Sequence, residues 1–301
     1  MTPIPTVHSS FNDWLAMIQR SKSRSTWKTY KSASSIFKQL VTRKDKPLQE
    51  LSAKDYEVFI QKLKTYHPRT EKLYATIIAL YFEYLSAKNL RRINMDSIRF
   101  TRRNETRKVG KRLRRMDMPS ITQIAKQVAK IKPGKSLLLH RAKTLVLFLC
   151  RGGLRAFEAV GLKTGNLDRA HLRGTVIGKG NKEGRFVFDK DCLSALDEYR
   201  SHHKVKTDWL FLSHSRRHMK EAPHPISTDT SLRDVVLIVS LVLENEPAYK
   251  ITPHQFRHYF VTKIHREKGL KMAQTLARHE NIDTTQNYIH VEDEDVDIVE
   301  R

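Results

Sequence analysis

Residues 152–162 read GGLRAFEAVGL, and this stretch says more about the fold and chemistry of the chain than any other. Gly152 and Gly153 predict a turn that leads into a helix starting near Arg155. An arginine at the start of a helix directs its guanidinium fork and the positive helix end to one place, which favours an anion. Glu158, one turn on, shares that face and is placed to hold the guanidinium. The alternative is an ordinary ion pair on the surface.

Outside this stretch, residues 254–258 (HQFRH) supply a second basic fork beside titratable imidazoles. Pro253 suits the first turn of a helix, and the three-residue spacing places His254 and Arg257 on one face. His254 and His258 also have the i,i+4 spacing of zinc-binding helices. No acid or cysteine nearby supplies a third ligand at a known spacing, so we favour the basic fork over a metal site.

A third candidate segment is residues 276–290, LARHENIDTTQNYIH, which holds His279 and Tyr288. A lone tyrosine in a helical stretch is usually half-buried packing. Tyr288, however, follows three polar residues and lies near the C-terminus, which is a poor place for an obligatory core tyrosine. We therefore treat Tyr288 as a candidate nucleophile.

A fourth candidate lies in residues 173–188, RGTVIGKGNKEGRFVF, whose alternation and glycines predict a β-hairpin. Lys179 stands between Gly178 and Gly180 at the turn, where it can reach into a groove and donate a proton. An exposed turn lysine is the alternative, and Lys182 is a second, weaker candidate for the same role.

Charge indicates the kind of partner. The 301 residues include 56 Lys and Arg against 32 Asp and Glu, a formal net charge of +24 with a pI near 10.1. Such an excess attracts a polyanion through counterion release. Ribosomal or membrane-surface contacts would also suit a basic protein, but the globular pattern and the lack of an amphipathic anchor favour nucleic acid.

Other features bound the class of protein. Hydrophobic residues make up 39% and charged residues 29%, as in globular proteins. No apolar run approaches membrane-spanning length, and the N-terminus shows no secretion signal, so we expect no membrane association. Cys150 and Cys192 form no CxxC pair, which argues against zinc fingers and disulfides and fits a reducing cytoplasm.

The chain divides into four predicted parts. Residues 1–98 form a helical domain, with amphipathic helices between 9 and 90 and a capping-box start at Ser52 and Asp55. Residues 99–119 hold nine Lys and Arg against two acids and predict a basic linker, either lying along phosphates or a solvated tether. Residues 120–290 form a mixed domain. Residues 291–301, with six acids and one arginine, form an acidic tail.

Within the mixed domain, periodicity predicts helices and one hairpin. A capped helix begins at Ser120, and the hairpin occupies residues 173–188. The other predicted helices cover residues 136–151, a stretch from about 155, 189–203, 228–244, 253–268, 270–278 and 284–289. The whole chain is thus predicted to be mainly α with a small β-hairpin or sheet, an α+β fold.

These residue types meet the needs of metal-free attack on a phosphodiester: a nucleophile, cations for the phosphate oxygens and an acid for the leaving oxygen. Their order and intervals resemble the tyrosine recombinase (phage integrase) family. The GLRxxE segment, the GKGNK hairpin, the HxxRH helix and the H-x8-Y segment with its TTQ carry this resemblance. It covers residues 120–290 well, and the N-terminal helices more loosely resemble the core-binding (SAM-like) domain of that family.

The resemblance implies a site-specific DNA recombinase that closes around double-stranded DNA as a C-shaped clamp. Tyr288 would form a 3′-phosphotyrosyl bond and release a 5′-hydroxyl, without ATP, metal or other cofactor. The other implied roles are phosphate binding (Arg155, Arg257), general acid (Lys179), proton transfer at the nucleophile (His254), a transition-state hydrogen bond (His279) and support (Glu158). The family acts as a tetramer on two synapsed sites, here in a bacterial or archaeal cytoplasm.

Two departures from the family pattern stand out. Arg278 occupies the small position of the usual Leu-Gly-His, where it either contacts DNA or perturbs the helix. Gly184 looks inserted after the GKGNKE run. The chain also shows no arm-binding domain, which favours a simple recombinase.

Rival functions are an idle DNA-binding accessory protein and a type IB topoisomerase-like strand relaxer. An idle protein would be expected to have lost at least one catalytic residue. Integration, excision and resolution of a mobile element or plasmid all remain open tasks. The acidic tail is either solvated or docks on a neighbouring subunit, and we favour docking.

Overall fold

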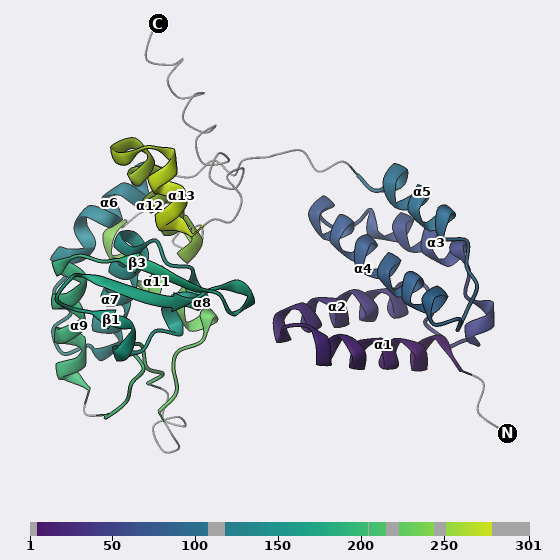
Figure 1. The fold of residues 1–301 in the computed structure, drawn as a ribbon, viewed down its shortest axis with the longest axis horizontal. Helices are drawn as coiled ribbons and strands as arrows, with labels where there is room; N and C mark the ends of the chain where they lie inside the picture. Colours follow the sequence, from purple (N-terminus) through teal and green to yellow (C-terminus); the bar gives the residue numbers. More distant parts are fainter. Residues whose placement is uncertain (1–4, 108–117, 204, 215–222, 244–250, 279–301) are drawn as a thin grey trace, which may run out of the picture. The chain divides into compact units, whose positions relative to one another are not determined.

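The computed structural model describes residues 5–107, 118–203, 205–214, 223–243 and 251–278; the side chains of residues 118, 119 and 179 lie outside this description. The chain divides into two compact units, Met1–Arg112 and Leu113–Arg301, and each has its own hydrophobic core. Helices dominate both units, and the sheet of the described residues lies in the second (Figure 1). The predicted α+β class is confirmed. No described helix is both long and apolar enough to cross a membrane.

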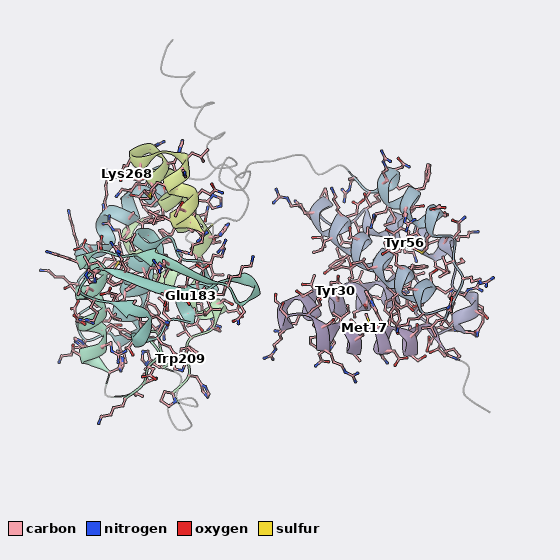
Figure 2. The ribbon with its side chains drawn as sticks, in the orientation of Figure 1. Met17, Tyr30, Tyr56, Glu183, Trp209 and Lys268 are labelled. Atoms are coloured by element: carbon pink, nitrogen blue, oxygen red, sulfur yellow. The ribbon has the colours of Figure 1, made fainter. Side chains whose placement is uncertain are left out.

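The first unit is a helical bundle whose helices start at capping residues. Ser52 and Asp55 form the predicted capping box, in which the Ser52 N–H donates to the Asp55 carboxylate at 2.8 Å. Tyr56, labelled in Figure 2, is buried among the helices and donates its hydroxyl to the carbonyl of Ala75 at 2.9 Å. The elements are α1 (Val7–Ser21), α2 (Arg24–Leu40), η1 (Leu48–Glu50), α3 (Ala53–Leu63), α4 (Pro68–Ala87) and α5 (Met95–Glu105).

Helix α5 carries the first unit past the predicted boundary at residue 98. The sequence predicted a linker over residues 99–119, whereas α5 continues to Glu105. Its start is capped by the Asn94 side chain, which accepts two main-chain N–H groups. Ile98 and Thr101 are buried where α5 packs against α3 and α4. Two buried positions among many charges are too weak a period to read from sequence.

A buried carboxylate fixes the residues that follow α5. The main-chain N–H and Nε of Arg107 donate to the Glu71 carboxylate at 2.9 and 2.5 Å, and Nη2 of Arg107 donates to the carbonyl of Tyr66. Glu71 is fully buried and also accepts from Lys64 at 3.2 Å. The basic segment is therefore anchored to the first unit as far as residue 107. Residues 108–117 of the predicted linker lie outside the described ranges.

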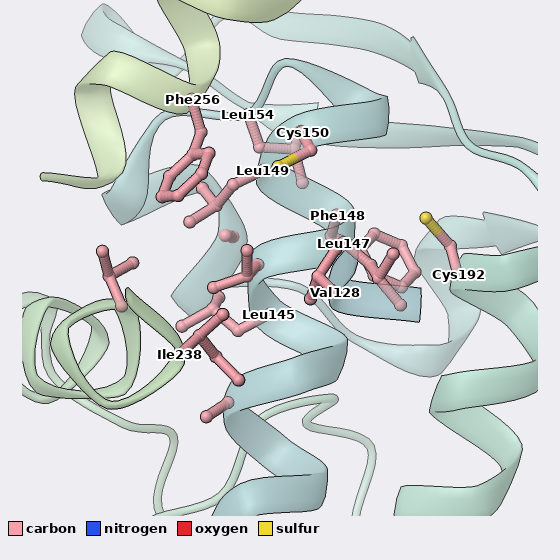
Figure 3. Packing of buried hydrophobic residues seen from close by; sticks show 14 of the residues in the cluster. Val128, Leu145, Leu147, Phe148, Leu149, Cys150, Leu154, Cys192, Ile238 and Phe256 are labelled. Atoms are coloured by element: carbon pink, nitrogen blue, oxygen red, sulfur yellow. The ribbon is translucent and has the colours of Figure 1, made fainter. Parts of the chain in front are cut away.

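The second unit is built around α7, in which nearly every side chain from His140 to Cys150 is buried. Figure 3 shows Leu145, Phe148 and their neighbours packed against side chains from the surrounding helices, including Ile238 and Phe256. A helix that is buried on all sides, as α7 is, lies in the centre of its domain. The elements are α6 (Met118–Gln127), η2 (Val128–Lys130), α7 (Leu137–Gly152), α8 (Ala156–Val160), η3 (Thr164–Asn166), β1 (Leu167–Asp168), β2 (Arg173–Ile177), η4 (Lys179–Asn181), β3 (Glu183–Val187), α9 (Lys190–His202), α11 (Thr228–Val242), α12 (Pro253–Lys268) and α13 (Leu270–Ala277).

The predicted helices over 136–151, 189–203, 228–244, 253–268 and 270–278 are present with ends shifted by at most two residues. The predicted hairpin is also confirmed. Strands β2 and β3 pair antiparallel, with Thr175 opposite Arg185 and Ile177 opposite Glu183. The short strand β1 adds a third, unpredicted partner in the order β1-β2-β3. The predicted helix over 284–289 lies outside the described residues.

Gly153, which ends α7, is expected to tolerate no side chain. Its φ of +58° lies in the left-handed region, and a Cβ would come within 2.2 Å of the Phe260 ring. Gly153→Ala should combine a backbone cost of ~1–2 kcal/mol with an overpacking cost of ~1–3 kcal/mol. Urea unfolding of the whole chain measures the sum.

Gly134→Ala is the matched control for this variant. Gly134 has a φ of +59°, and a Cβ there would meet no atom within 4 Å. The free energy of unfolding of this variant should fall by the backbone cost alone. Equal losses in the two variants would contradict the expected clash with Phe260.

Candidate active site

Arg155 and Glu158 form the first part of the site, at the junction of α7 and α8. Arg155 caps the start of α8, and its main-chain N–H donates to Glu158 Oε2 at 2.9 Å. Its Nη1 donates to Glu158 Oε1 at 2.7 Å. The Glu158 side chain is fully buried, whereas that of Arg155 is 30% exposed. A surface ion pair was the alternative, but the carboxylate faces the interior and holds an arginine that opens to solvent.

Arg257 reaches the same carboxylate from α12. It is fully buried, and its Nη1 donates to the carbonyl of Gly153 at 2.6 Å and lies 3.8 Å from Glu158 Oε2. Its Nη2 donates to the carbonyl of Ala277, the last residue of α13. The structure thus brings Arg155 and Arg257, over a hundred residues apart, to one buried carboxylate. Two of the segments that we predicted to act together, those of Arg155 and Arg257, therefore meet at Glu158.

Arg278 is a third guanidinium at Glu158. It follows α13, and its Nη2 donates to Glu158 Oε2 at 2.8 Å and to the carbonyl of Gly153 at 3.3 Å. Its side chain is only 12% exposed. The sequence left open whether Arg278 contacts DNA or perturbs the helix. Its guanidinium lies in a buried ion pair, and its left-handed backbone ends α13. The one sequence signal was a large cation where relatives have a small residue.

The three guanidinium groups keep Glu158 ionised. Burial alone would raise the pKa of this carboxyl, but Arg278, the hydrogen bonds from Arg155 and the charge of Arg257 hold it below its usual range. Three cations around one anion leave an excess of positive charge at the junction. The arrangement is therefore suited to binding an anion such as a phosphate group.

His254 lies beside this cluster, one turn before Arg257 on α12, and its side chain is exposed. Neighbouring protein atoms remove part of the water around the ring, and this desolvation lowers the pKa of His254. The positive charges of Arg257 and Arg155 lower it further. The imidazole is therefore neutral near pH 7 and able to accept a proton. The His254 and His258 rings lie 4.7 Å apart and perpendicular. Among the described residues, no three or more His, Cys, Asp and Glu side chains gather to hold a metal ion.

The turn that carries Lys179 begins next to Glu158. A Cβ on Gly178 would lie 3.9 Å from Glu158 Oε1, and the Gly178 N–H donates to the carbonyl of Lys182 at 2.7 Å. The backbone of Lys179 starts the η4 turn, and its side chain lies outside the description. The backbone of the hairpin turn thus lies next to Glu158, and the role of Lys179 stays a prediction.

His279 and Tyr288 both lie outside the described residues. Residue 279 follows Arg278 directly, so the described chain stops at the Glu158 cluster. The roles of these two residues stay predictions.

Comparison with known proteins identifies the class. The sequence profile of the Phage integrase family matches residues 111–295, more than half of the chain. Tyrosine recombinase XerC of Treponema denticola is 26% identical over 288 residues, covering 90% of each chain. XerC of Staphylococcus carnosus is 31% identical over 156 residues, 50% of this chain and 49% of the relative.

Solved structures show the same fold. The XerH site-specific recombinase bound to palindromic difH substrate matches with a TM-score of 0.70 at 18% identity, covering 93% of this chain and 80% of that chain. A lambda integrase (75–356) dimer bound to a COC′ core site matches with a TM-score of 0.68 at 16% identity, covering 94% and 95%. The fold is that of these two DNA-bound structures. The chain belongs to the Phage integrase family and is a tyrosine-type site-specific recombinase.

Proposed function

We propose that the chain cleaves and rejoins double-stranded DNA at one specific site through a 3′-phosphotyrosyl bond to Tyr288. The observation that carries the proposal is the convergence of Arg155, Arg257 and the hairpin turn on the buried carboxylate of Glu158. Such a preorganised cationic site stabilises the charge that develops on a phosphate under attack.

In the proposed reaction, the Tyr288 oxygen bonds to the scissile phosphorus, and the bond from phosphorus to the 5′ oxygen breaks. His254 takes the tyrosine proton, since its lowered pKa leaves it neutral. Lys179 gives a proton to the leaving 5′ oxygen. Rejoining runs these steps backwards from another 5′-hydroxyl, so both protons return and no ATP is consumed. Arg155 and Arg257 bind the phosphate oxygens, and His279 donates to them in the transition state.

The assembly and its setting are part of the proposal. The first unit and the basic segment after α5 would bind the duplex together with the second unit. Lambda integrase has been solved as a tetramer bound to a Holliday junction, at a TM-score of 0.64 and 16% identity. We propose the same number of subunits here, on two synapsed sites in the cytoplasm. Whether the task is integration, excision or resolution is decided by where the DNA site lies.

The test is to trap the covalent complex in excess EDTA. Purified protein is incubated with randomly nicked genomic DNA of its source, denatured, and the attached DNA is sequenced. A nick next to the cleaved bond lets the short 5′-hydroxyl fragment diffuse away, so the adduct accumulates. We expect the adduct to form in EDTA, because two arginines and a lysine supply the charge that metals supply elsewhere. We also expect one short sequence to dominate the attached DNA, because the proposed enzyme acts at one specific site.

Two outcomes would contradict the proposal. Adducts at random sequences would indicate a strand relaxer without a specific site. Adducts that vanish in EDTA and return with zinc or magnesium would restore the metal interpretation of His254 and His258. Parallel incubation with added magnesium separates the second outcome from an inactive preparation.

A further inference from the structure

We propose that Arg278 is a positioning residue for strand cleavage, holding the start of the segment that carries Tyr288 on the Arg155–Glu158 pair. The inference rests on the proposed function. Besides Glu158 and Gly153, Arg278 Nη1 donates to the carbonyls of Arg185 and Leu276, both at 3.1 Å. One side chain therefore joins the α7–α8 turn, strand β3 and the end of α13.

The backbone of Arg278 requires such compensation. Its φ of 56° and ψ of 44° are left-handed, a conformation that a β-carbon disfavours and that glycine adopts without cost. The hydrogen bonds of the Arg278 side chain offset the cost of this backbone conformation. The left-handed turn also sets the direction in which the chain leaves α13 toward residue 279.

Strand β3 makes room for this side chain at Gly184. A Cβ on residue 184 would lie 2.5 Å from Cδ of Arg278. Gly184 and Arg278 are the two departures from the family pattern noted in the sequence, and they touch. The contact indicates that the hairpin is built to accept the arginine.

Arg278 also controls the charge state of Glu158. Among the described residues, the groups that face Glu158 are Arg155 on its own turn, Arg257 on α12, Arg278 after α13 and the main chain at Gly178. Of the charges that lower the pKa of Glu158 against its burial, Arg278 is the first. Without Arg278 this pKa rises, so a fall in pH protonates Glu158 and frees the Arg155 fork.

The experiment compares Arg278→Asn, which tolerates the left-handed backbone but lacks charge, with Arg278→Lys, which keeps charge but lacks the fork. The substrate is a nicked duplex carrying the sequence recovered in the trapping experiment. We expect single-turnover cleavage to fall ~10²-fold in the Asn variant, with unchanged DNA affinity. Arg169→Ala, which removes an exposed arginine paired with Asp197, should cleave as the unchanged chain does.

The pH profile separates positioning from a general loss of structure. As the pH falls, the Asn variant should lose rate more steeply than the unchanged chain, approaching tenfold per pH unit below the raised pKa of Glu158. His254 titrates in both proteins, so the difference between profiles reports Glu158. The Lys variant should have a lower rate and an unchanged profile. Parallel profiles for the Asn variant and the unchanged chain, or an undiminished rate, would overturn the proposal.

Two further measurements keep the inference apart from the proposed function. Gly184→Ala should slow cleavage in the unchanged chain but not further in Arg278→Asn, because the clash partner is gone. If the unchanged chain forms no adduct, the proposed function fails. The pairing of Arg278 with Glu158 is then tested only by urea unfolding of Glu158→Gln, Arg278→Asn and the double variant. Midpoint shifts that add fully would overturn the pairing; a double variant less destabilised than the sum supports it.

Discussion

Tyr288→Phe should abolish the covalent protein–DNA adduct and leave DNA affinity intact. The phenol oxygen is the atom that bonds to phosphorus in the proposed reaction, and phenylalanine lacks it. Loss of a nucleophile is among the largest effects of a single substitution, and we expect a fall of ~10⁴-fold or more in cleavage. Binding is spread over many lysines and arginines, so a filter-binding titration should be unchanged. Denaturing electrophoresis of nicked duplex carrying the recovered site measures the adduct.

Tyr259→Phe is the matched control. Tyr259 lies on α12 two residues after Arg257, and burial raises the pKa of its phenol, so it is a poor nucleophile. Its Phe variant should form the adduct normally. An undiminished adduct in Tyr288→Phe would refute the assignment and direct attention to Tyr249 or Tyr259.

Arg155→Ala should reduce single-turnover cleavage by ~10²–10³-fold, because a preorganised donor to the transition state is lost. The same change removes one phosphate contact among many, so the slope of log affinity against log salt should change by only about one unit. Arg155→Lys should also be slow, since a point charge cannot donate to Glu158 and a phosphate as a planar fork does. Cleavage and filter binding on the same nicked duplex give both quantities.

Substitution of Arg155 tests the proposed chemistry more directly than substitution of Arg257, because Arg155 is partly exposed and Arg257 is buried. Arg257 is fully buried, and its removal would leave the carbonyl of Ala277 without this donor, at ~1–3 kcal/mol of stability, and the carbonyl of Gly153 with the donor from Arg278. A slow Arg257 variant would thus mix chemistry with unfolding. Arg169→Ala again serves as the control. Affinity that falls in step with rate in Arg155→Ala would make Arg155 an ordinary DNA contact.

Local signals predicted much of this fold. The Ser52–Asp55 capping box, the Pro253 start of α12 and the glycine-rich hairpin are each determined by residues three or four apart, and each is present. Helix α5 was missed because it has few apolar residues, and only its packing on α3 and α4 shows which face is buried. Strand β1 is too short for any period.

The candidate site was predictable in its parts and not in its connections. Spacing placed Arg155 beside Glu158 and His254 beside Arg257. The meeting of Glu158 with Arg278 joins residues 120 apart in sequence, and no local pattern encodes it. Glu158 was expected to support one arginine, whereas three surround it. The three arginines around this buried carboxylate come from separate segments of the chain, so a short stretch of sequence does not show how many of them meet there.

The anchoring of Arg107 on Glu71 determines where a mechanical load enters the helical unit. Tension along the chain after residue 107 is transmitted through two bonds to the Glu71 carboxylate and one to the Tyr66 carbonyl, in the first turn of α4 and just before it. We therefore expect a pull on the chain after residue 107 to load these three bonds together rather than one after another.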